Sequence, residues 1–390
     1  MTRYGLLAIV AALIAIAIGR AFGVVELFVI GAGFAGAFVA AVAFVGLRSP
    51  HVSGARRIRP SILVAGDVGH VDLELRHTGA LRSTRFTLRE RVRRAHVADH
   101  VAELSVEPMP ARGTVTATYQ LPTSQRGAID LGPLEAVVTD PLGLLRRTRL
   151  VAGTDRITVA PRSHQLAMPE LGSGPLGRHL LAQARRLGPG EFHGLREYVD
   201  GDEPRTIHWR ASARSDGLLV KQHEVEGLRR MLIVLDTDPD SYADPMSFER
   251  AVTAAASLAL SAVHADLVTR FVSGDVDLRG PDVAADALRV LAEVQPDGAP
   301  LPMFDHESGE GVGLLVSIAG SRDATGHRRA RSVVDPTQAT VMVTTDETTR
   351  SAIGVTARTE AEFLSNWNAL VGRAGVRRPV GAGARAGGKR

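Results

Sequence analysis

Two apolar runs at the start of the chain constrain its fold more than any other feature. Residues 4–18 and 27–47 contain no charged side chain. An α-helix rises about 1.5 Å per residue, so the second run is long enough to cross the hydrocarbon core of a bilayer. The first run is long enough if its helix continues past Arg20 with that side chain extending to the interface. We therefore predict a two-helix transmembrane hairpin over residues 1–47.

The charges around these runs predict their orientation. Arg3 precedes the first run, and the segment between the runs carries only Arg20 and Glu26. Four arginines follow the second run: Arg48, Arg56, Arg57 and Arg59. By the positive-inside rule, both ends of the hairpin lie in the cytoplasm, and we treat residues 48–59 as a basic juxtamembrane linker. A cleaved signal peptide is the alternative for the first run. We expect a multi-pass protein of the plasma membrane with cytoplasmic N- and C-termini.

The second run contains the pattern G-x-G-x-x-G, which also occurs in dinucleotide-binding turns. Such a turn needs an acidic residue about twenty positions later, to hold a ribose. None occurs between Glu26 and Asp67. We predict instead that small residues spaced four apart let two membrane helices approach closely. These residues are Ala32, Gly36 and Ala40.

Residues 60–160 show a different pattern, with short segments in which apolar and polar residues alternate. Examples are residues 68–75 and 114–121, which glycine, proline and polar turns separate from their neighbours. This pattern predicts a small antiparallel β-sandwich, with the role of a spacer or interaction module near the membrane. The run D-P-L-G-L-L follows at 140–145, and residues 161–189 are rich in proline, glycine and arginine, which predicts a linker.

Residues 227–372 alternate strand-like and helix-like segments. Residues 231–235 are apolar and end at Asp236, and helical patterns follow at about 246–264 and 281–294. Alternation of this kind predicts a doubly wound α/β domain, in which functional groups gather at the carboxyl ends of the strands. The whole chain is therefore predicted to be multidomain: a membrane hairpin, a β-sandwich and an α/β domain.

Three carboxylates cluster at the end of the first strand of this domain: Asp236, Asp238 and Asp240. Carboxylate oxygens bind Mg²⁺, so a weak magnesium site is one interpretation, and a solvated acidic loop is the other. A phosphohydrolase with Asp236 as nucleophile is a further alternative. Two features oppose it: Asp240 replaces the expected threonine or valine, and no lysine follows before Lys389. We therefore predict no catalytic residues and no required cofactor.

Composition excludes several classes of protein. Cysteine is absent, so the chain has no disulfide, thiolate metal site or cysteine nucleophile. The formal net charge is only +4 and basic residues are not interleaved with aromatic ones, so we predict no nucleic-acid partner. Residues 373–390 are rich in glycine, alanine and arginine, which predicts a disordered basic tail.

The segment 190–226 contains the most distinctive pattern, G-x-F-x-x-L-R-E-Y-x-x-G-D-x-x-R-x-I-x-W-x-x-S-A-R. Its opposite charges alternate, which is typical of a structural clasp that holds a fold together or of a docking surface for a partner. Arg205 and Trp209 lie four residues apart, so the guanidinium can stack on the indole if the segment is helical there. The candidate residues of this signature segment are Glu191, Arg196, Glu197, Tyr198, Gly201, Asp202, Arg205, Trp209 and Arg214.

This spacing closely resembles the signature of the domain-of-unknown-function-58 family, and the D-P-L-G-L run resembles a second signature of that family. The resemblance implies that residues 227–372 have a von Willebrand factor A-like fold. The metal site of that fold reads D-x-S-x-S, so the carboxylates at 238 and 240 replace both serines and imply a degenerate site. A metal-dependent adhesion module that uses Asp236, Asp238 and Asp240 stays as an alternative.

The resemblance also implies a function. It indicates a non-catalytic, membrane-anchored scaffold that is a partner of a MoxR-type AAA+ ATPase. Such a pair would help to remodel or mature other proteins or envelope complexes. The client protein does not follow from the sequence.

Overall fold

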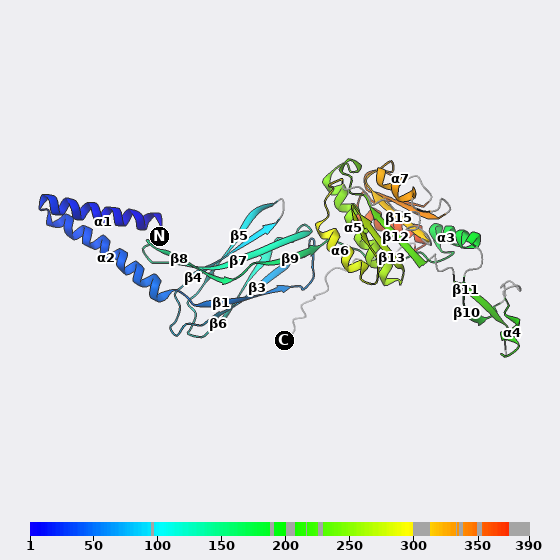
Figure 1. Cartoon of the computed structure of the whole chain (residues 1–390), viewed down its shortest axis with the longest axis horizontal. Coiled ribbons are helices and arrows are strands. Elements are labelled where there is room, and N and C mark those ends of the chain that lie inside the picture. Colours follow the sequence, from blue (N-terminus) through cyan, green and yellow to red (C-terminus); the bar gives the residue numbers. More distant parts are fainter. Residues whose placement is uncertain are drawn as a thin grey trace, which may run out of the picture. The chain divides into compact units, whose positions relative to one another are not determined.

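The computed structural model has a multidomain layout, as the sequence predicts. It divides into two compact units, Met1–Ala160 and Pro161–Arg390 (Figure 1). The described residues are 1–94, 97–187, 191–199, 207–215, 217–224, 229–298, 313–332, 334, 338–348 and 353–373.

The first unit begins with a helical hairpin formed by α1 (Arg3–Phe22) and α2 (Val25–Arg48). The Thr2 side chain caps the start of α1, and Gly23, with φ of 71°, ends it in the left-handed conformation that glycine adopts easily. Both helices are long and apolar enough to cross a membrane, and most of their side chains are exposed within the protein. Exposed apolar faces distinguish them from the core helices of soluble proteins, in which one face is buried.

Small residues bring the two helices together, but not those that the spacing predicts. A Cβ on Gly31 would lie 2.6 Å from the Ile16 side chain, and one on Gly19 would lie 2.8 Å from a backbone nitrogen of α2. The predicted ridge is wrong, because all three of its residues are exposed: Ala32, Gly36 and Ala40. The contact face of α2 is instead the one that carries Gly31 and Ala41, both of which are buried.

Two sheets follow the hairpin, antiparallel except for the short parallel pairing of β2 with β9. The first has the order β1-β3-β6, and the second has the order β2-β9-β7-β4-β5 with β8 paired to β7. The strands are β1 (Val52–Arg59), β2 (Leu63–Val64), β3 (Gly69–His77), β4 (Phe86–Arg94), β5 (Val97–Val106), β6 (Thr114–Leu121), β7 (Gly127–Thr139), β8 (Arg146–Ala152) and β9 (Asp155–Ala160). Residues 48–59, predicted as a linker, therefore include a strand. In the sequence, Arg56 and Arg57 resemble the basic residues that flank a membrane helix. The alternation of burial along β1 is therefore not apparent from the sequence.

A buried charge cluster links the two sheets of this β-module. Glu90 on β4 is 0% exposed, and its carboxylate accepts hydrogen bonds from Arg56 Nε on β1 at 2.5 Å and from the Tyr119 hydroxyl on β6 at 2.6 Å. Arg56 also contacts Asp155, which is largely exposed, and donates to the Gly153 carbonyl. Burial, the hydrogen bond to Glu90 and the Glu90 charge raise the pKa of Tyr119 well above its usual value, so its hydroxyl stays a donor. One carboxylate thus joins both outer strands of the opposite sheet.

The D-P-L-G-L run forms the turn between β7 and β8, and this turn contacts α1. The Asp140 side chain accepts from the backbone nitrogens of Leu142 and Leu145 at 2.9 and 2.5 Å, which fixes the turn. The Thr2 hydroxyl lies 2.6 and 2.8 Å from the carbonyl oxygens of Gly143 and Leu144. The run is therefore a connection between the β-module and the start of the helical hairpin.

We expect Gly5→Ala to separate this turn from α1. Alanine is usually more favourable than glycine inside a helix by up to about 1 kcal/mol. A Cβ on Gly5, however, would lie 2.1 Å from the Leu144 carbonyl oxygen. We therefore expect the unfolding temperature of the full chain in detergent to fall by at least about 2 °C.

Gly33→Ala is the matched control, since a Cβ there meets nothing within 4 Å. It should leave the unfolding temperature unchanged or raise it. Equal unfolding temperatures in the two variants would contradict a tight contact at Gly5.

The second unit contains a six-stranded sheet of order β14-β13-β12-β15-β16-β17, parallel except for β14. Its strands are β12 (Arg230–Leu235), β13 (Val268–Ser273), β14 (Val276–Leu278), β15 (Leu314–Ala319), β16 (Ala339–Thr344) and β17 (Gly354–Thr356). The helices are α3 (Gly174–Leu187), α5 (Pro245–His264), α6 (Val283–Glu293), α7 (Thr325–Ser332) and α8 (Glu360–Val371). Strand order and crossovers are those of a doubly wound α/β domain.

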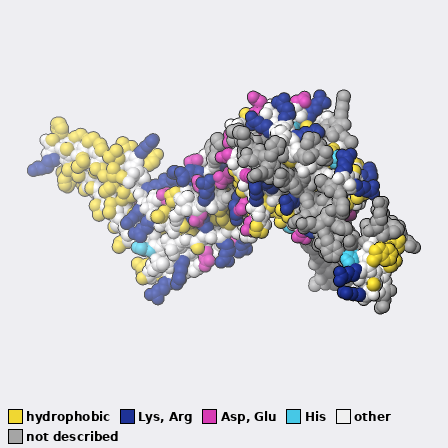
Figure 2. Space-filling model, turned by 45° about the vertical axis from the view of Figure 1, so that its right-hand side comes forward, with side chains coloured by type: hydrophobic (Ala, Val, Ile, Leu, Met, Phe, Trp, Pro, Cys, Tyr) yellow, Lys and Arg dark blue, Asp and Glu magenta, His cyan; other side chains and the backbone are white. Residues whose placement is uncertain are grey.

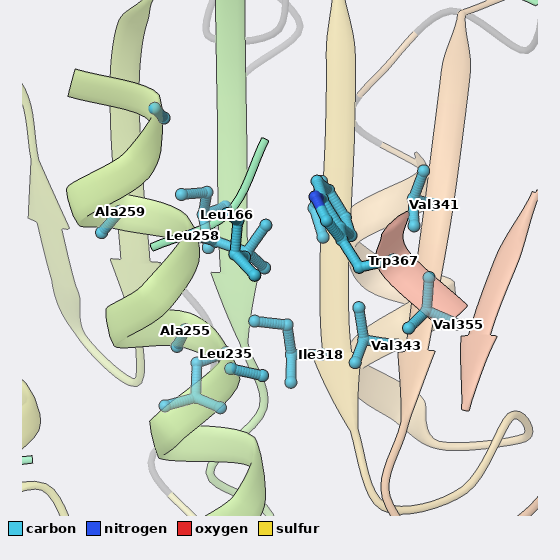
Figure 3. Packing of buried hydrophobic residues seen from close by; sticks show 14 of the residues in the cluster. Leu166, Leu235, Ala255, Leu258, Ala259, Ile318, Val341, Val343, Val355 and Trp367 are labelled. Atoms are coloured by element: carbon cyan, nitrogen blue, oxygen red, sulfur yellow. The ribbon is translucent and has the colours of Figure 1, made fainter. Parts of the chain in front are cut away.

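The main core lies between one face of this sheet and the helices α3, α5, α6 and α8, and Figure 3 shows part of it. Alanines of α5 such as Ala255 and Ala259 let that helix approach the sheet, and Trp367 of α8 packs between Leu166 and the strands. Leu166 precedes α3, so residues 161–187, the described part of the linker predicted over 161–189, contribute to the core instead. The glycines and prolines of residues 161–187 lie before and at the start of α3, and the apolar residues Leu176 and Leu180 of this helix are buried.

Candidate functional site

The signature segment forms a β-hairpin with a short helix. Strands β10 (Glu191–Glu197) and β11 (Leu219–Glu224) pair in antiparallel fashion, and α4 (Trp209–Ser212) precedes β11. The His208 side chain accepts from the backbone nitrogen of Ala211 and so caps α4. The Ser212 hydroxyl accepts from the Leu219 backbone nitrogen at 2.8 Å, which ties α4 to β11.

The described part of this hairpin exposes large side chains. Trp209 is 65% exposed, and Val199 and Leu218 are exposed as well. Arg210 and Arg214 are also exposed. Figure 2 shows apolar and basic side chains together on this part of the molecule. Tryptophan side chains are on average highly buried in folded proteins, so this exposed indole marks a candidate contact surface.

The structure describes only some of the predicted signature residues. Glu197 and Arg214 are exposed and Tyr198 is partly buried. Glu191 and Arg196 lie on β10, where only the backbone is described. Gly201, Asp202 and Arg205 lie outside the described residues, and with them the predicted stacking of Arg205 on Trp209.

The second candidate site is the carboxyl edge of the α/β sheet, where β12 and β15 lie side by side. Connections leave these two strands in opposite directions, and ligands of doubly wound folds bind at such a switch point. Asp236 follows β12 directly and is buried. Its backbone nitrogen donates to the Ile318 carbonyl of β15 at 2.9 Å. The sequence therefore placed Asp236 correctly at a strand end.

Protein donors surround the Asp236 carboxylate. Oδ2 accepts from the Ser241 hydroxyl at 2.7 Å and from the Gly326 backbone nitrogen, at the start of α7, at 3.2 Å. Oδ1 accepts from the Asp238 backbone nitrogen at 3.1 Å. A Cβ on Gly326 would lie 2.4 Å from the carboxylate carbon, so only glycine fits there. This carboxylate connects three segments of the chain.

The other two aspartates of the triplet belong to the turn that follows. Asp238 caps the short 3₁₀ helix Pro239–Ser241 by accepting from the Asp240 nitrogen at 3.1 Å, and Asp240 is exposed. In the part of the chain that the structure describes, no three His, Cys, Asp or Glu side chains gather as they would around a metal ion. Three protein donors already occupy most of the lone-pair positions of the Asp236 carboxylate. The geometry therefore favours a hydrogen-bonded turn over a magnesium site.

Sequence reasoning missed a fourth carboxylate at this edge. Asp346 follows β16, and its Oδ2 accepts from the Ala243 nitrogen at 2.9 Å. It also forms a long ion pair with Arg250 of α5, at 3.5 Å. Burial and the charges of Asp236, Asp346 and Asp238 raise the pKa of Tyr242 well above its usual value. The Tyr242 hydroxyl is thus protonated and donates to the Asp236 carbonyl at 2.5 Å.

One further pair of chemical interest is buried. His327 Nδ1 lies 2.7 Å from the Ser317 hydroxyl, and burial lowers the pKa of His327 to about 4. The imidazole is therefore neutral near pH 7. Both residues are almost fully buried, so this serine–histidine pair offers no access to a substrate.

Comparisons with known proteins identify the family. A family model described as a protein of unknown function, DUF58, matches residues 194–298. The resemblance predicted from the signature is confirmed over this segment, where residues 194–298 match the DUF58 family model. None of the curated proteins matches the sequence.

Similarities to solved structures are weak. A β-glucosidase from Erythrobacter marinus matches with 11% identity and a TM-score of 0.21, over 28% of this chain and 15% of that one. An alkylpurine DNA glycosylase from Pseudomonas fluorescens matches with 11% identity and a TM-score of 0.21, over 33% and 38%. A CARDB domain from Pyrococcus furiosus matches with 10% identity and a TM-score of 0.19, over 29% and 88%. At these TM-scores the similarities define neither the fold nor the activity of this chain.

Proposed function

We propose that the protein is a membrane-anchored, non-catalytic adaptor that presents its signature hairpin to a partner protein. The observation that carries this proposal is the exposed Trp209 with the exposed arginines Arg210 and Arg214. Tryptophan and arginine are the side chains that most often anchor protein–protein interfaces. A role as docking surface is therefore favoured over a purely structural clasp, which would bury the indole.

The helical hairpin supplies the membrane anchor in this proposal. Support comes from the length and apolar composition of α1 and α2 and from the exposure of their large side chains. Arg3 and Arg48 lie at the same end of the hairpin, so the positive-inside rule orients both termini toward the cytoplasm of the cell. The β-module and the α/β domain then lie on the cytoplasmic side of the plasma membrane.

The α/β domain acts as a binding scaffold rather than an enzyme. Its strand order, with an antiparallel edge strand β14, supports the von Willebrand factor A-like fold that the family resemblance implies. Its switch-point carboxylate, Asp236, is engaged by three protein donors. A carboxylate held in this way is poorly placed to act as a nucleophile or a metal ligand.

A MoxR-type AAA+ ATPase is the partner that the family resemblance implies. The test is a crosslinking pull-down of the tagged full-length protein from its native membrane, with and without ATP. Recovery of an AAA+ ATPase in an amount that depends on the nucleotide supports the proposal. Recovery of the tagged protein without any ATPase under both conditions contradicts it.

Trp209→Ala should reduce the recovery of this partner at least about tenfold, because truncation of an interface tryptophan commonly costs 2 kcal/mol or more. The unfolding temperature should not change, since the indole is exposed. Met246→Ala is the matched control, because Met246 is similarly exposed on α5, outside the signature segment. Loss of stability with Trp209→Ala would instead favour the clasp.

A further inference from the structure

The turn between β7 and β8 exposes an apolar side chain next to the helical hairpin. Leu144 is buried against Ala8 of α1 and Ala41 of α2, and Leu145 packs against the same cluster. Leu142, at the tip of the turn, is 60% exposed. The turn therefore lies alongside helix surfaces that are themselves apolar and exposed.

The depth of this contact follows from the geometry of α1. Ala8 lies five residues after Arg3, the first residue of the helix, and a helix rises about 1.5 Å per residue. The turn thus contacts the hairpin from the level of Thr2 to a depth of roughly 7 Å inside the level of Arg3. If Arg3 lies among the lipid headgroups, this depth matches that of apolar groups buried about 5–10 Å into the boundary between headgroups and acyl chains.

Basic side chains follow the apolar turn directly. Arg146 and Arg147 are exposed on β8, and Arg3 and Arg48 mark the ends of the two helices. Arginines near the surface of an anionic membrane are attracted to its headgroups. An apolar tip with arginines immediately behind it is the pattern of a segment that inserts into a membrane interface. A protein partner would need a matching acidic rim at the same depth in the bilayer.

We propose that the turn 140–145 is a membrane-interface wedge. It inserts Leu142 into the bilayer surface beside α1 and α2, while Arg146 and Arg147 bind the headgroups of anionic lipids. The wedge holds the β-module against the membrane, in addition to the covalent connection from α2 to β1. This inference rests on the proposed membrane anchoring, and its test separates the two.

The absence of cysteine makes site-specific labelling direct. Three single-cysteine variants of the full-length chain carry a nitroxide in vesicles of phosphatidylcholine and phosphatidylglycerol: Leu142→Cys, Leu13→Cys and Val68→Cys. Leu13 is an exposed position in the middle of α1. Val68 is exposed beyond the far end of β1, an eight-residue strand about 26 Å long that begins just after α2. The measurement compares collision of each nitroxide with oxygen, which enters lipid, and with a water-soluble nickel complex.

We expect Leu13→Cys to be accessible mainly to oxygen, Val68→Cys mainly to nickel, and Leu142→Cys to show an intermediate accessibility typical of shallow insertion. A Leu142 label as accessible to nickel as the Val68 label, with Leu13 still in lipid, overturns the wedge and leaves the membrane anchor standing. A Leu13 label in water overturns the anchor itself.

The headgroup contact is tested in the same Leu142→Cys background. Arg146→Gln with Arg147→Gln should lower the oxygen accessibility of the label in vesicles that contain phosphatidylglycerol. In pure phosphatidylcholine the double substitution should have little effect. Equal effects in both lipids would overturn the assignment of these arginines to anionic headgroups.

Discussion

Glu90→Ala is expected to lower the unfolding free energy of the β-module by about 3–5 kcal/mol, because it leaves a buried arginine without its buried partner. Arg56 is 4% exposed in its side chain, so water cannot replace the lost carboxylate oxygen at 2.5 Å. The Tyr119 hydroxyl loses its acceptor as well. Hydrogen exchange of the β4 and β7 amides in the full-length protein measures this loss, because it reports on the β-module separately from the α/β domain.

Two controls separate a broken charge pair from a general effect of substitution. Asp155→Ala removes the other carboxylate that contacts Arg56, but this side chain is 59% exposed, so the cost should stay near or below about 1 kcal/mol. The double substitution Glu90→Leu with Arg56→Met replaces the pair with apolar groups of similar size and should recover most of the stability. An equal loss of unfolding free energy for Glu90→Ala and Asp155→Ala would show that burial of the Glu90–Arg56 pair does not increase its contribution to stability.

The strands of the β-module follow from alternation, whereas this charge cluster does not. Glu90 lies in the run R-E-R-V-R-R, which resembles a solvated strand face when read alone. Its burial depends on Arg56 and Tyr119, which lie 34 and 29 residues away on strands of the opposite sheet. The same charges led us to predict a linker over residues 48–59, although β1 alternates in burial along its whole length.

At the candidate site of the α/β domain, too, contacts between residues far apart in the chain do not follow from the sequence. The position of Asp236 at a strand end follows from the apolar run before it. Its hydrogen bond with Gly326, 90 residues further along the chain, does not follow from the sequence, and neither does the position of Asp346 at another strand end. In the sequence, three aspartates in five residues resemble a metal site. In the folded protein, two of them form hydrogen bonds to nearby backbone nitrogens and the third is exposed.

Asp236→Ala is expected to destabilise the α/β domain by about 2–4 kcal/mol, because a buried donor left without its acceptor costs about 1–3 kcal/mol. The Ser241 hydroxyl and the Gly326 nitrogen both lose their acceptor, and α7 loses its connection to β12. Urea unfolding followed by the fluorescence of Trp367 measures the effect, since this indole is fully buried in the core of the domain. The exposed Trp209 adds a signal that is removed with Trp209→Ala in every sample.

Asp240→Ala distinguishes a structural role of the three aspartates from a role in metal binding. Asp240 is exposed, so its replacement should change the unfolding free energy by less than about 0.5 kcal/mol. If the three aspartates bound Mg²⁺, the ion would raise the stability of the unsubstituted protein, and both Asp236→Ala and Asp240→Ala would remove that increase. We expect no increase with Mg²⁺, because three protein donors already occupy most of the lone pairs of the Asp236 carboxylate. A Mg²⁺-dependent rise in the urea midpoint that both substitutions abolish would contradict this account and favour the adhesion module over the adaptor.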